Sequence, residues 1–161
     1  MADVFALTDI NDSVILDLSP FIAGPPGSED PKFPTAERLS SRAESFVHSG
    51  VVIGSVHDST RPIFIPIAVR PSIGGTTATA DGVEQKWAQI VVALDAAKGL
   101  KVQLNGWAAA IFYDIHPTSL AHRDYSTSDQ RDLWIVGHID IEAQPYPRGG
   151  LVSPTFTSGS A

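Results

Sequence analysis

Histidine and acidic side chains gather in one polar stretch of the sequence, from His116 to Arg131. His116, His122 and Asp124 fall within nine residues of this stretch. Imidazole and carboxylate groups are the usual ligands of metal sites and the usual proton carriers of acid–base sites. Metal-binding helices and turns space their ligands more tightly, however, and no second cluster supplies further ligands. We therefore interpret the stretch as a solvated or subunit-contact loop, and we expect neither a metal nor another cofactor.

Other residues that could serve catalysis have simpler interpretations. Asp140 and Glu142 lie two positions apart, so a strand would place both carboxylates on one face, as a glycosidase needs. Charged residues on a polar strand face usually point to solvent, and the same interpretation applies to His138. The sequence contains no Gly-x-Ser-x-Gly nucleophile motif, Walker loop or dinucleotide fingerprint. We expect that the chain is not an enzyme.

The composition narrows the class of protein. The 161 residues are 43% hydrophobic and 18% charged, which favours one globular domain over a disordered chain. The formal net charge of −7 argues against a basic surface for nucleic acid. Because cysteine is absent, disulfides, thiolate nucleophiles and cysteine-ligated metals are excluded. No apolar run is long enough to predict a membrane span, and the first residues do not resemble a secretory signal.

The first half of the chain predicts short strands joined by turns and one long loop. Proline and glycine break regular structure throughout the expected loop from Phe21 to Pro34, and Thr35–Leu39 could form a helical turn. Alternating aliphatic residues predict a strand that ends at Val69. Because proline donates no hydrogen bond, Pro62 and Pro66 make it an edge strand or a strand with one unpaired face. The expected strands are Val4–Leu7, Val14–Leu18, Phe46–Gly54 and Arg61–Val69.

A helix from Gly82 to Lys98 is the strongest local pattern of the second half. Its apolar residues recur at helical spacing, and Asp81 is placed to cap its first turn after a Gly/Thr/Ala-rich loop, Gly74–Ala80. The sequence Asn105-Gly106 then predicts a tight hairpin turn between two strands. The strands expected after the helix are Leu100–Leu104, Trp107–Ile115 and Leu133–Ala143.

These elements amount to about seven strands and one long helix without β-α-β alternation. They predict a mainly β (α+β) domain over residues 1–148, an antiparallel split β-barrel or sandwich with one packed helix. Residues 149–161 are rich in Gly, Ser, Thr and Pro and are expected to form a flexible tail or linker.

Aromatic residues divide between the expected core and the expected surface. Trp87 and Trp107 fall on apolar faces and are expected in the core, whereas Trp134 falls on the polar face of its strand. An exposed tryptophan suits a subunit contact or a sugar-binding platform, and we favour the subunit contact. The residues expected at subunit contacts are Trp134, Phe64, His122, Tyr125 and Phe33.

The order of the elements resembles a known family. An N-terminal strand pair precedes the strand Arg-Pro-Ile-Phe-Ile-Pro-Ile-Ala-Val at 61–69, and a capped helix leads into Leu-Lys-Val-Gln-Leu at 100–104. A Tyr-Asp-Ile strand follows, and the last strand ends in Ala-Gln-Pro-Tyr at 143–146. Over residues 4–148 this order is similar to the N-terminal belt domain of phage distal tail proteins and related minor tail proteins.

The resemblance implies a structural virion protein of the tail tip, assembled in the host cytoplasm. Six copies would form a ring of the distal tail or baseplate hub, between the tail tube and the receptor-binding or tip proteins. DNA would pass through the channel without sequence-specific binding, and no membrane insertion is expected. Distal tail proteins often carry a second, C-terminal domain that has no counterpart in this sequence. Two alternatives stay open: a tail terminator or tube-like ring subunit, and a small carbohydrate- or protein-binding β-sandwich.

Overall fold

The computed structural model describes residues 3–22, 30–34, 38–44, 51–124 and 133–150, with the backbone alone for 38–44 and 51–57. Nine strands and two helices lie within these ranges. In chain order they are β1 (Val4–Thr8), β2 (Val14–Asp17), α1 (Ser19–Ile22), β3 (Arg38–Glu44), β4 (Val51–Asp58), β5 (Arg61–Val69), α2 (Ala80–Ala96), β6 (Gly99–Gln103), β7 (Ile111–Asp114), β8 (Leu120–Asp124) and β9 (Ile135–Ala143).

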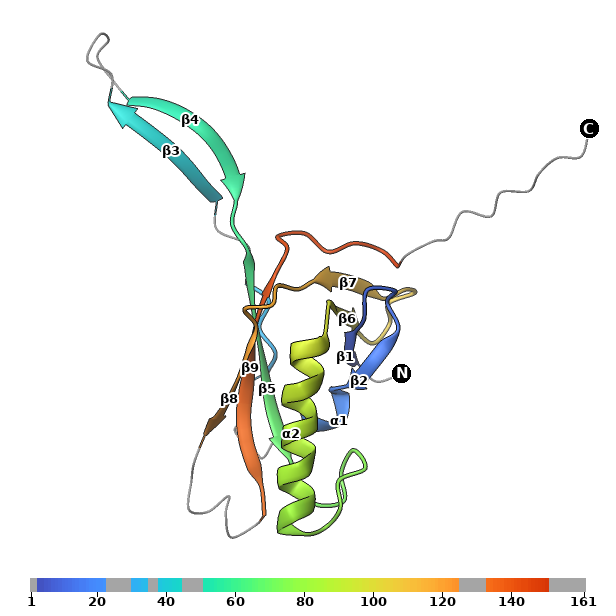
Figure 1. Cartoon of the computed structure of the whole chain (residues 1–161). Helices are drawn as coiled ribbons and strands as arrows, with labels where there is room; N and C mark the ends of the chain where they lie inside the picture. Colours follow the sequence, from blue (N-terminus) through green and yellow to red (C-terminus); the bar gives the residue numbers. More distant parts are fainter. Residues whose placement is uncertain (1–2, 23–29, 35–37, 45–50, 125–132, 151–161) are drawn as a thin grey trace, which may run out of the picture.

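Seven of these strands form the two antiparallel sheets of the body. One sheet has the order β2-β1-β6-β7 and the other has the order β5-β9-β8. Helix α2 lies alongside both sheets, where it contacts β2 of the first and β5, β8 and β9 of the second (Figure 1). The predicted antiparallel, mainly β architecture with one long packed helix is confirmed.

The other two strands, β3 and β4, pair with each other as an antiparallel hairpin. Figure 1 shows this hairpin projecting away from the body. The helical turn predicted at Thr35–Leu39 is wrong within the described residues, because the backbone from Arg38 onward is extended and pairs with β4. Of the strand predicted at Phe46–Gly54, the structure describes the part from Val51, which belongs to β4 and continues to Asp58, whereas residues 45–50 lie outside the described ranges.

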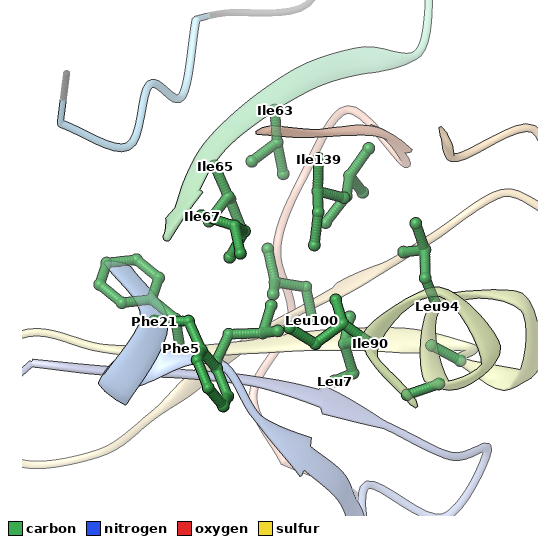
Figure 2. Packing of buried hydrophobic residues seen from close by; sticks show 14 of the residues in the cluster. Phe5, Leu7, Phe21, Ile63, Ile65, Ile67, Ile90, Leu94, Leu100 and Ile139 are labelled. Atoms are coloured by element: carbon green, nitrogen blue, oxygen red, sulfur yellow. The ribbon is translucent and has the colours of Figure 1, made fainter. Parts of the chain in front are cut away.

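Apolar side chains from both sheets and from α2 meet between the sheets (Figure 2). The alternation along β5 turns Ile63, Ile65 and Ile67 inward, where each is at most 1% exposed. They face Leu7 of β1 and Leu100 of β6, while α2 closes one side of the core. Complete burial of one such aliphatic side chain contributes about 1.5–3 kcal/mol, so the alternation on β5 fixes which face of the strand is inside.

Helix α2 buries the predicted stripe but begins earlier than the sequence suggested. Val83, Ile90 and Leu94 are buried, and Trp87 packs half-buried against the core. The residue that caps the helix is Thr79 and not Asp81, since the Thr79 hydroxyl accepts a hydrogen bond from the Gly82 amide at 3.0 Å. Thr79 falls within the Gly/Thr/Ala-rich segment that predicts a loop, so the sequence pattern favours Asp81 as the capping residue.

Two other expectations are wrong in the second half of the chain. Trp107 is 40% exposed and not part of the core, because residues 104–107 form a turn and β7 begins only at Ile111. The stretch from His116 to Arg131 is not a continuous loop, because residues 120–124 form β8, which pairs with β9. Strand β8 is held in place by its backbone pairing with β9 and not by burial of apolar side chains. Its sequence therefore lacks the apolar alternation by which a strand is predicted.

Candidate functional site

The outward face of the sheet β5-β9-β8 carries a row of aromatic and imidazole rings. Phe64 of β5 lies beside His138 of β9, with ring centroids 5.0 Å apart. His138 stacks in turn on His122 of β8, with centroids 4.8 Å apart and planes 21° apart. The two histidines are direct cross-strand partners in the β8–β9 register, so they share one face of the sheet.

Asp140 of β9 lies beside this row and contacts both histidines. Its Oδ2 lies 3.1 Å from Nε2 of His122 and 3.4 Å from Nε2 of His138. Asp140 stands two positions after His138 on β9, so the pleat of the strand places both side chains on the same face. The side chains of His122 and Asp140 are about half exposed, at 47% and 53%, and His138 is 27% exposed. We call His122, His138 and Asp140 the histidine cluster.

Gly137 lets strand β8 approach β9 closely behind the histidine cluster. A Cβ atom at Gly137 would overlap the backbone oxygen of His122 and lie 2.8 Å from the Trp87 ring. Real Cβ atoms do not approach other atoms so closely. Glycine at position 137 therefore allows the close spacing of β8, which carries His122, and β9, which carries His138.

The Phe64 end of the row is covered by the segment that precedes β3. Lys32 and Phe64 exchange two backbone hydrogen bonds of 2.8 and 3.0 Å along the outer edge of β5. The Lys32 ammonium lies 5.4 Å from the centroid of the Phe64 ring, a cation–π contact. Strand β5 is thus an edge strand of its sheet, as Pro62 and Pro66 predicted, with a short backbone bridge at its outer side.

The structure separates the residues that were expected at subunit contacts. Phe64 and His122 lie in the ring row, whereas Phe33 is half-buried and stacks between Phe5 and Tyr113 at 6.0 and 5.9 Å. Trp134 is half-buried, and the guanidinium of Arg70 lies 5.4 Å from its ring centroid. Because a protein cation already occupies one ring face, Trp134 is a poor open platform for a sugar. Tyr125 lies outside the described residues.

The candidate metal ligands noted in the sequence are not brought together as a set. His116 contacts the amide of Gln144 at 3.3 Å, away from the histidine cluster, and only His122 of the original three belongs to that cluster. His138 and Asp140 were interpreted as solvent-facing side chains of one strand. Their relation to His122 depends on β8, whose pairing the sequence pattern did not reveal.

The paired carboxylates Asp140 and Glu142 have different hydrogen-bond and ion-pair partners. Asp140 faces the two histidines, whereas Glu142 accepts a hydrogen bond of 2.6 Å from the Thr118 hydroxyl.

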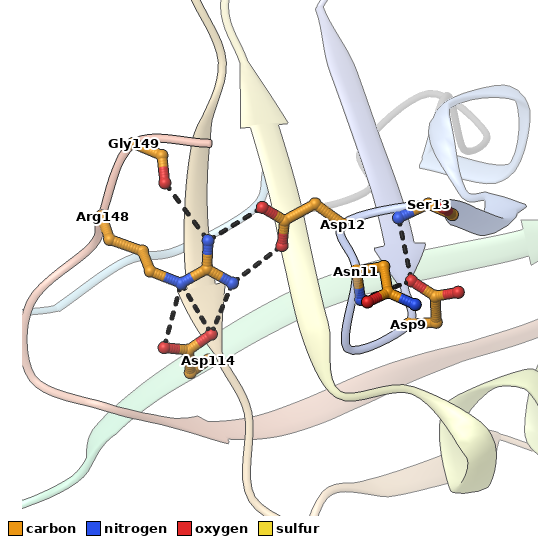
Figure 3. A network of polar contacts seen from close by, with 7 residues as sticks. All are labelled: Asp9, Asn11, Asp12, Ser13, Asp114, Arg148 and Gly149. Carbon is orange, nitrogen blue, oxygen red and sulfur yellow. Dashed lines mark hydrogen bonds and ion pairs between the residues drawn. The ribbon is translucent and has the colours of Figure 1, made fainter. Parts of the chain in front are cut away.

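A second polar cluster fastens the end of the described chain to the body (Figure 3). The guanidinium of Arg148 reaches Asp12 at 2.7 and 2.9 Å and Asp114 at 2.9–3.1 Å. Hydrogen bonds to Asp12, and then to Asp114, raise the pKa of Arg148 above its ordinary value, so its charge is fixed. The backbone of Arg148 also exchanges two hydrogen bonds with Phe112. We call Arg148, Asp12 and Asp114 the arginine clamp.

An apolar groove runs between α2 and the edge strand β2. It has a volume of about 680 Å³ and is lined by Ile15, Leu16, Gln85, Ala88, Gln89, Val92, Ala93 and Ala96. Val92 on the helix is 66% exposed and Ile15 on the strand is 40% exposed. The outer edge of β2 pairs with no other strand among the described residues. Aliphatic side chains and an open strand edge together are typical of a surface that receives a protein partner.

Comparison with known proteins bears on the fold. No protein-family model and no curated protein matches the sequence, and no helix among the described residues has the length and apolar character that crossing a membrane requires. The antiparallel body with one long helix is similar in fold to a phage tail hub protein. One matching crystal structure is that of the SPP1 Dit (gp 19.1) protein, described as a paradigm of the hub adsorption apparatus in phages that infect Gram-positive hosts. The two folds agree with a TM-score of 0.61 at 8% sequence identity.

This match covers 92% of the present chain and 53% of the SPP1 Dit chain. The present chain therefore spans about half the length of the protein it matches.

Proposed function

We propose that this chain is a structural subunit of a phage virion, a ring-forming component of the tail tip. In this proposal six copies form part of the distal tail or baseplate hub and link the tail tube to receptor-binding or tip proteins. The observation that carries the proposal is the fold likeness to the SPP1 Dit protein over 92% of the chain. The order of strands and helix that resembled distal tail proteins in the sequence is an independent argument for the same function.

The proposed ring needs two complementary surfaces on each subunit. In a closed head-to-tail ring, each subunit contacts its two neighbours through two different faces. The apolar groove between α2 and β2 supplies one such face, with Ile15 and Val92 as its exposed aliphatic residues. The net charge of −7 suits a channel wall along which DNA moves without adhering. In this function the chain binds DNA without sequence preference or not at all.

The mass of the purified full chain tests the proposal. Six copies of the 17.1 kDa chain form a ring of about 103 kDa, to be measured by light scattering and seen as an annulus in negative stain. A monomer at all concentrations up to the millimolar range would contradict the ring. Immunogold labelling of virions distinguishes a tail-tip ring from a tail terminator or tube-like ring.

A pair of matched variants tests where the subunits meet. Val92→Glu places a charge in the groove, and we expect it to abolish the ring while the monomer stays folded by circular dichroism. Leu120→Glu places the same charge on another exposed aliphatic residue, which is 59% exposed and outside the groove. We expect this control to assemble normally. Equal assembly of both variants would show that the groove is not the contact.

A further inference from the structure

We propose that the histidine cluster is a binding site for a divalent transition-metal ion, represented here by Zn²⁺. The proposal concerns a site separate from the groove and does not depend on ring assembly. It replaces the expectation of no metal, because that expectation considered His116, His122 and Asp124 and not the three residues that the fold brings together.

The distances from the Asp140 carboxylate to the two imidazole nitrogens match the spacing of ligands around one ion. Zn²⁺ is bound by imidazole nitrogen and carboxylate oxygen at about 2.0–2.2 Å, which in a tetrahedron separates the ligand atoms by about 3.3–3.5 Å. In the structure Asp140 Oδ2 lies 3.1 Å from one imidazole nitrogen and 3.4 Å from the other. All three ligand atoms lie within 4.8 Å of one another. Because the two imidazole planes are stacked 21° apart with centroids 4.8 Å apart, the rings must turn on their side-chain bonds to direct both nitrogens at one ion.

The three ligands stand on paired strands and not on loops. His122 and His138 are held opposite each other by the β8–β9 register, and Asp140 follows on the same face of β9. Phe64 packs beside His138 on the side away from His122, which limits the positions open to the His138 ring. A site built on rigid elements loses little freedom when the ion binds, which favours affinity.

The chemistry of the donor set selects the class of ion. Two imidazoles with one carboxylate suit borderline ions such as Zn²⁺, whereas Mg²⁺ and Ca²⁺ prefer oxygen ligands throughout. Because His122 and Asp140 are about half exposed, the fourth coordination position faces solvent and takes a water molecule. An ion there would join β8 to β9 by side chains in addition to the backbone ladder.

Calorimetric titration of the untagged full chain with ZnCl₂, after treatment with a chelator, tests the site. We expect one Zn²⁺ per chain and at least a tenfold weaker affinity for His122→Ala, His138→Ala and Asp140→Asn. His116→Ala removes a histidine outside the cluster and is expected to bind as the wild type does. The absence of saturable binding, or equal binding by the cluster variants and the wild type, would overturn the proposal.

Spectroscopy with Co²⁺ tests the site in the wild type, and so does not depend on whether the variants fold. Co²⁺ added to the wild type should give visible absorption bands of a four-coordinate site, and excess Zn²⁺ should remove them. Circular dichroism without metal shows whether each variant is folded, and only folded variants enter the comparison. An octahedral Co²⁺ spectrum that the cluster variants leave unchanged would contradict the assignment, since it would place the ion elsewhere.

Discussion

Arg148 illustrates how one side chain can hold together segments that are far apart in the sequence. Its guanidinium binds carboxylates from the turn after β1 and from the end of β7, more than a hundred residues apart. The side chain of Asp12 is only 9% exposed, and both of its carboxylate oxygens accept hydrogen bonds from the guanidinium. Burial of a charge without a partner is costly, and this makes the clamp stronger than an ordinary surface ion pair.

Arg148→Met should therefore lower the free energy of unfolding by about 1.5–3 kcal/mol, the range for hydrogen bonds to charged groups. Urea denaturation monitored by circular dichroism measures the change. Arg123→Met is the matched control, since Arg123 forms a two-point pair with Glu84, whose side chain is 56% exposed. We expect the control to lose less than about 1 kcal/mol. Equal losses would show that the clamp is no stronger than a surface pair.

The pair of Arg123 and Glu84 should make stability depend on pH in a defined direction. The hydrogen bonds from Arg123 are the main reason why the pKa of Glu84 is lowered from its ordinary 4.5. A lowered pKa in the folded state stabilises the fold at pH values above 4.5, and this contribution is lost as the pH falls through the folded value. The stability difference between wild type and Glu84→Gln should shrink accordingly in urea titrations below pH 4.5. The same difference measured in an Arg123→Met background should not vary with pH, and persistent variation would assign the effect to another group.

At the scale of elements, the distance between β8 and β9 depends on Gly137. The backbone of His122 and the ring of Trp87 occupy the space that any side chain at this position would need. Strand β8, helix α2 and strand β9 therefore meet at one residue. A change there acts on the histidine cluster through the backbone of His122 and replaces none of the three cluster residues.

Gly137→Ala should destabilise the chain by about 1–3 kcal/mol or more, because overpacking forces the backbone to move. The loss is measured by thermal and urea unfolding, and amide hydrogen exchange should rise in β8 before it rises in β1 or β6. Gly149→Ala is the control, since no atom lies within 4 Å of a Cβ at Gly149. An unchanged exchange rate in β8 would mean that the two strands are not packed as closely as described.

Apolar alternation made some elements predictable, and its absence concealed others. Ile63, Ile65 and Ile67 identified β5 and its inward face, and the stripe that contains Ile90 identified α2. Strand β8 carries exposed or half-exposed residues throughout, so its pairing with β9 could not be read from its own residues. For that reason the sequence places His122 at a subunit contact and His138 and Asp140 on a solvent-facing strand face, and it does not reveal that the three side chains meet.

At the scale of the whole molecule, charge and apolar surface act on assembly in opposite directions. Each subunit carries a net charge of −7, so copies repel one another, whereas the groove between α2 and β2 offers aliphatic surface to a neighbour. The repulsion is long-range and screened by salt, with a Debye length of about 10 Å at 0.1 M. The burial of apolar groups is not weakened by screening.

The proposed ring should therefore become more stable as the NaCl concentration rises from about 0.05 to 0.5 M, where the Debye length falls to only a few ångströms. Sedimentation velocity measures the fraction of ring at each salt concentration. Val92→Glu adds a charge to the groove, and any residual assembly of this variant should respond to salt more steeply than the wild type. Dissociation of the wild-type ring at high salt would indicate that ion pairs, and not the groove, hold the subunits together.

The arginine clamp also has a mechanical consequence. Strand β9 ends at Ala143, and a pull on the chain beyond Gly150 reaches the clamp and the two backbone bonds between Arg148 and Phe112 before it reaches β9. Tension is then passed to β7 and to the turn after β1, in the four-stranded sheet, and bypasses the sheet that carries the histidine cluster. A force applied to the chain after Gly150 would therefore load the four-stranded sheet and would not separate β8 from β9.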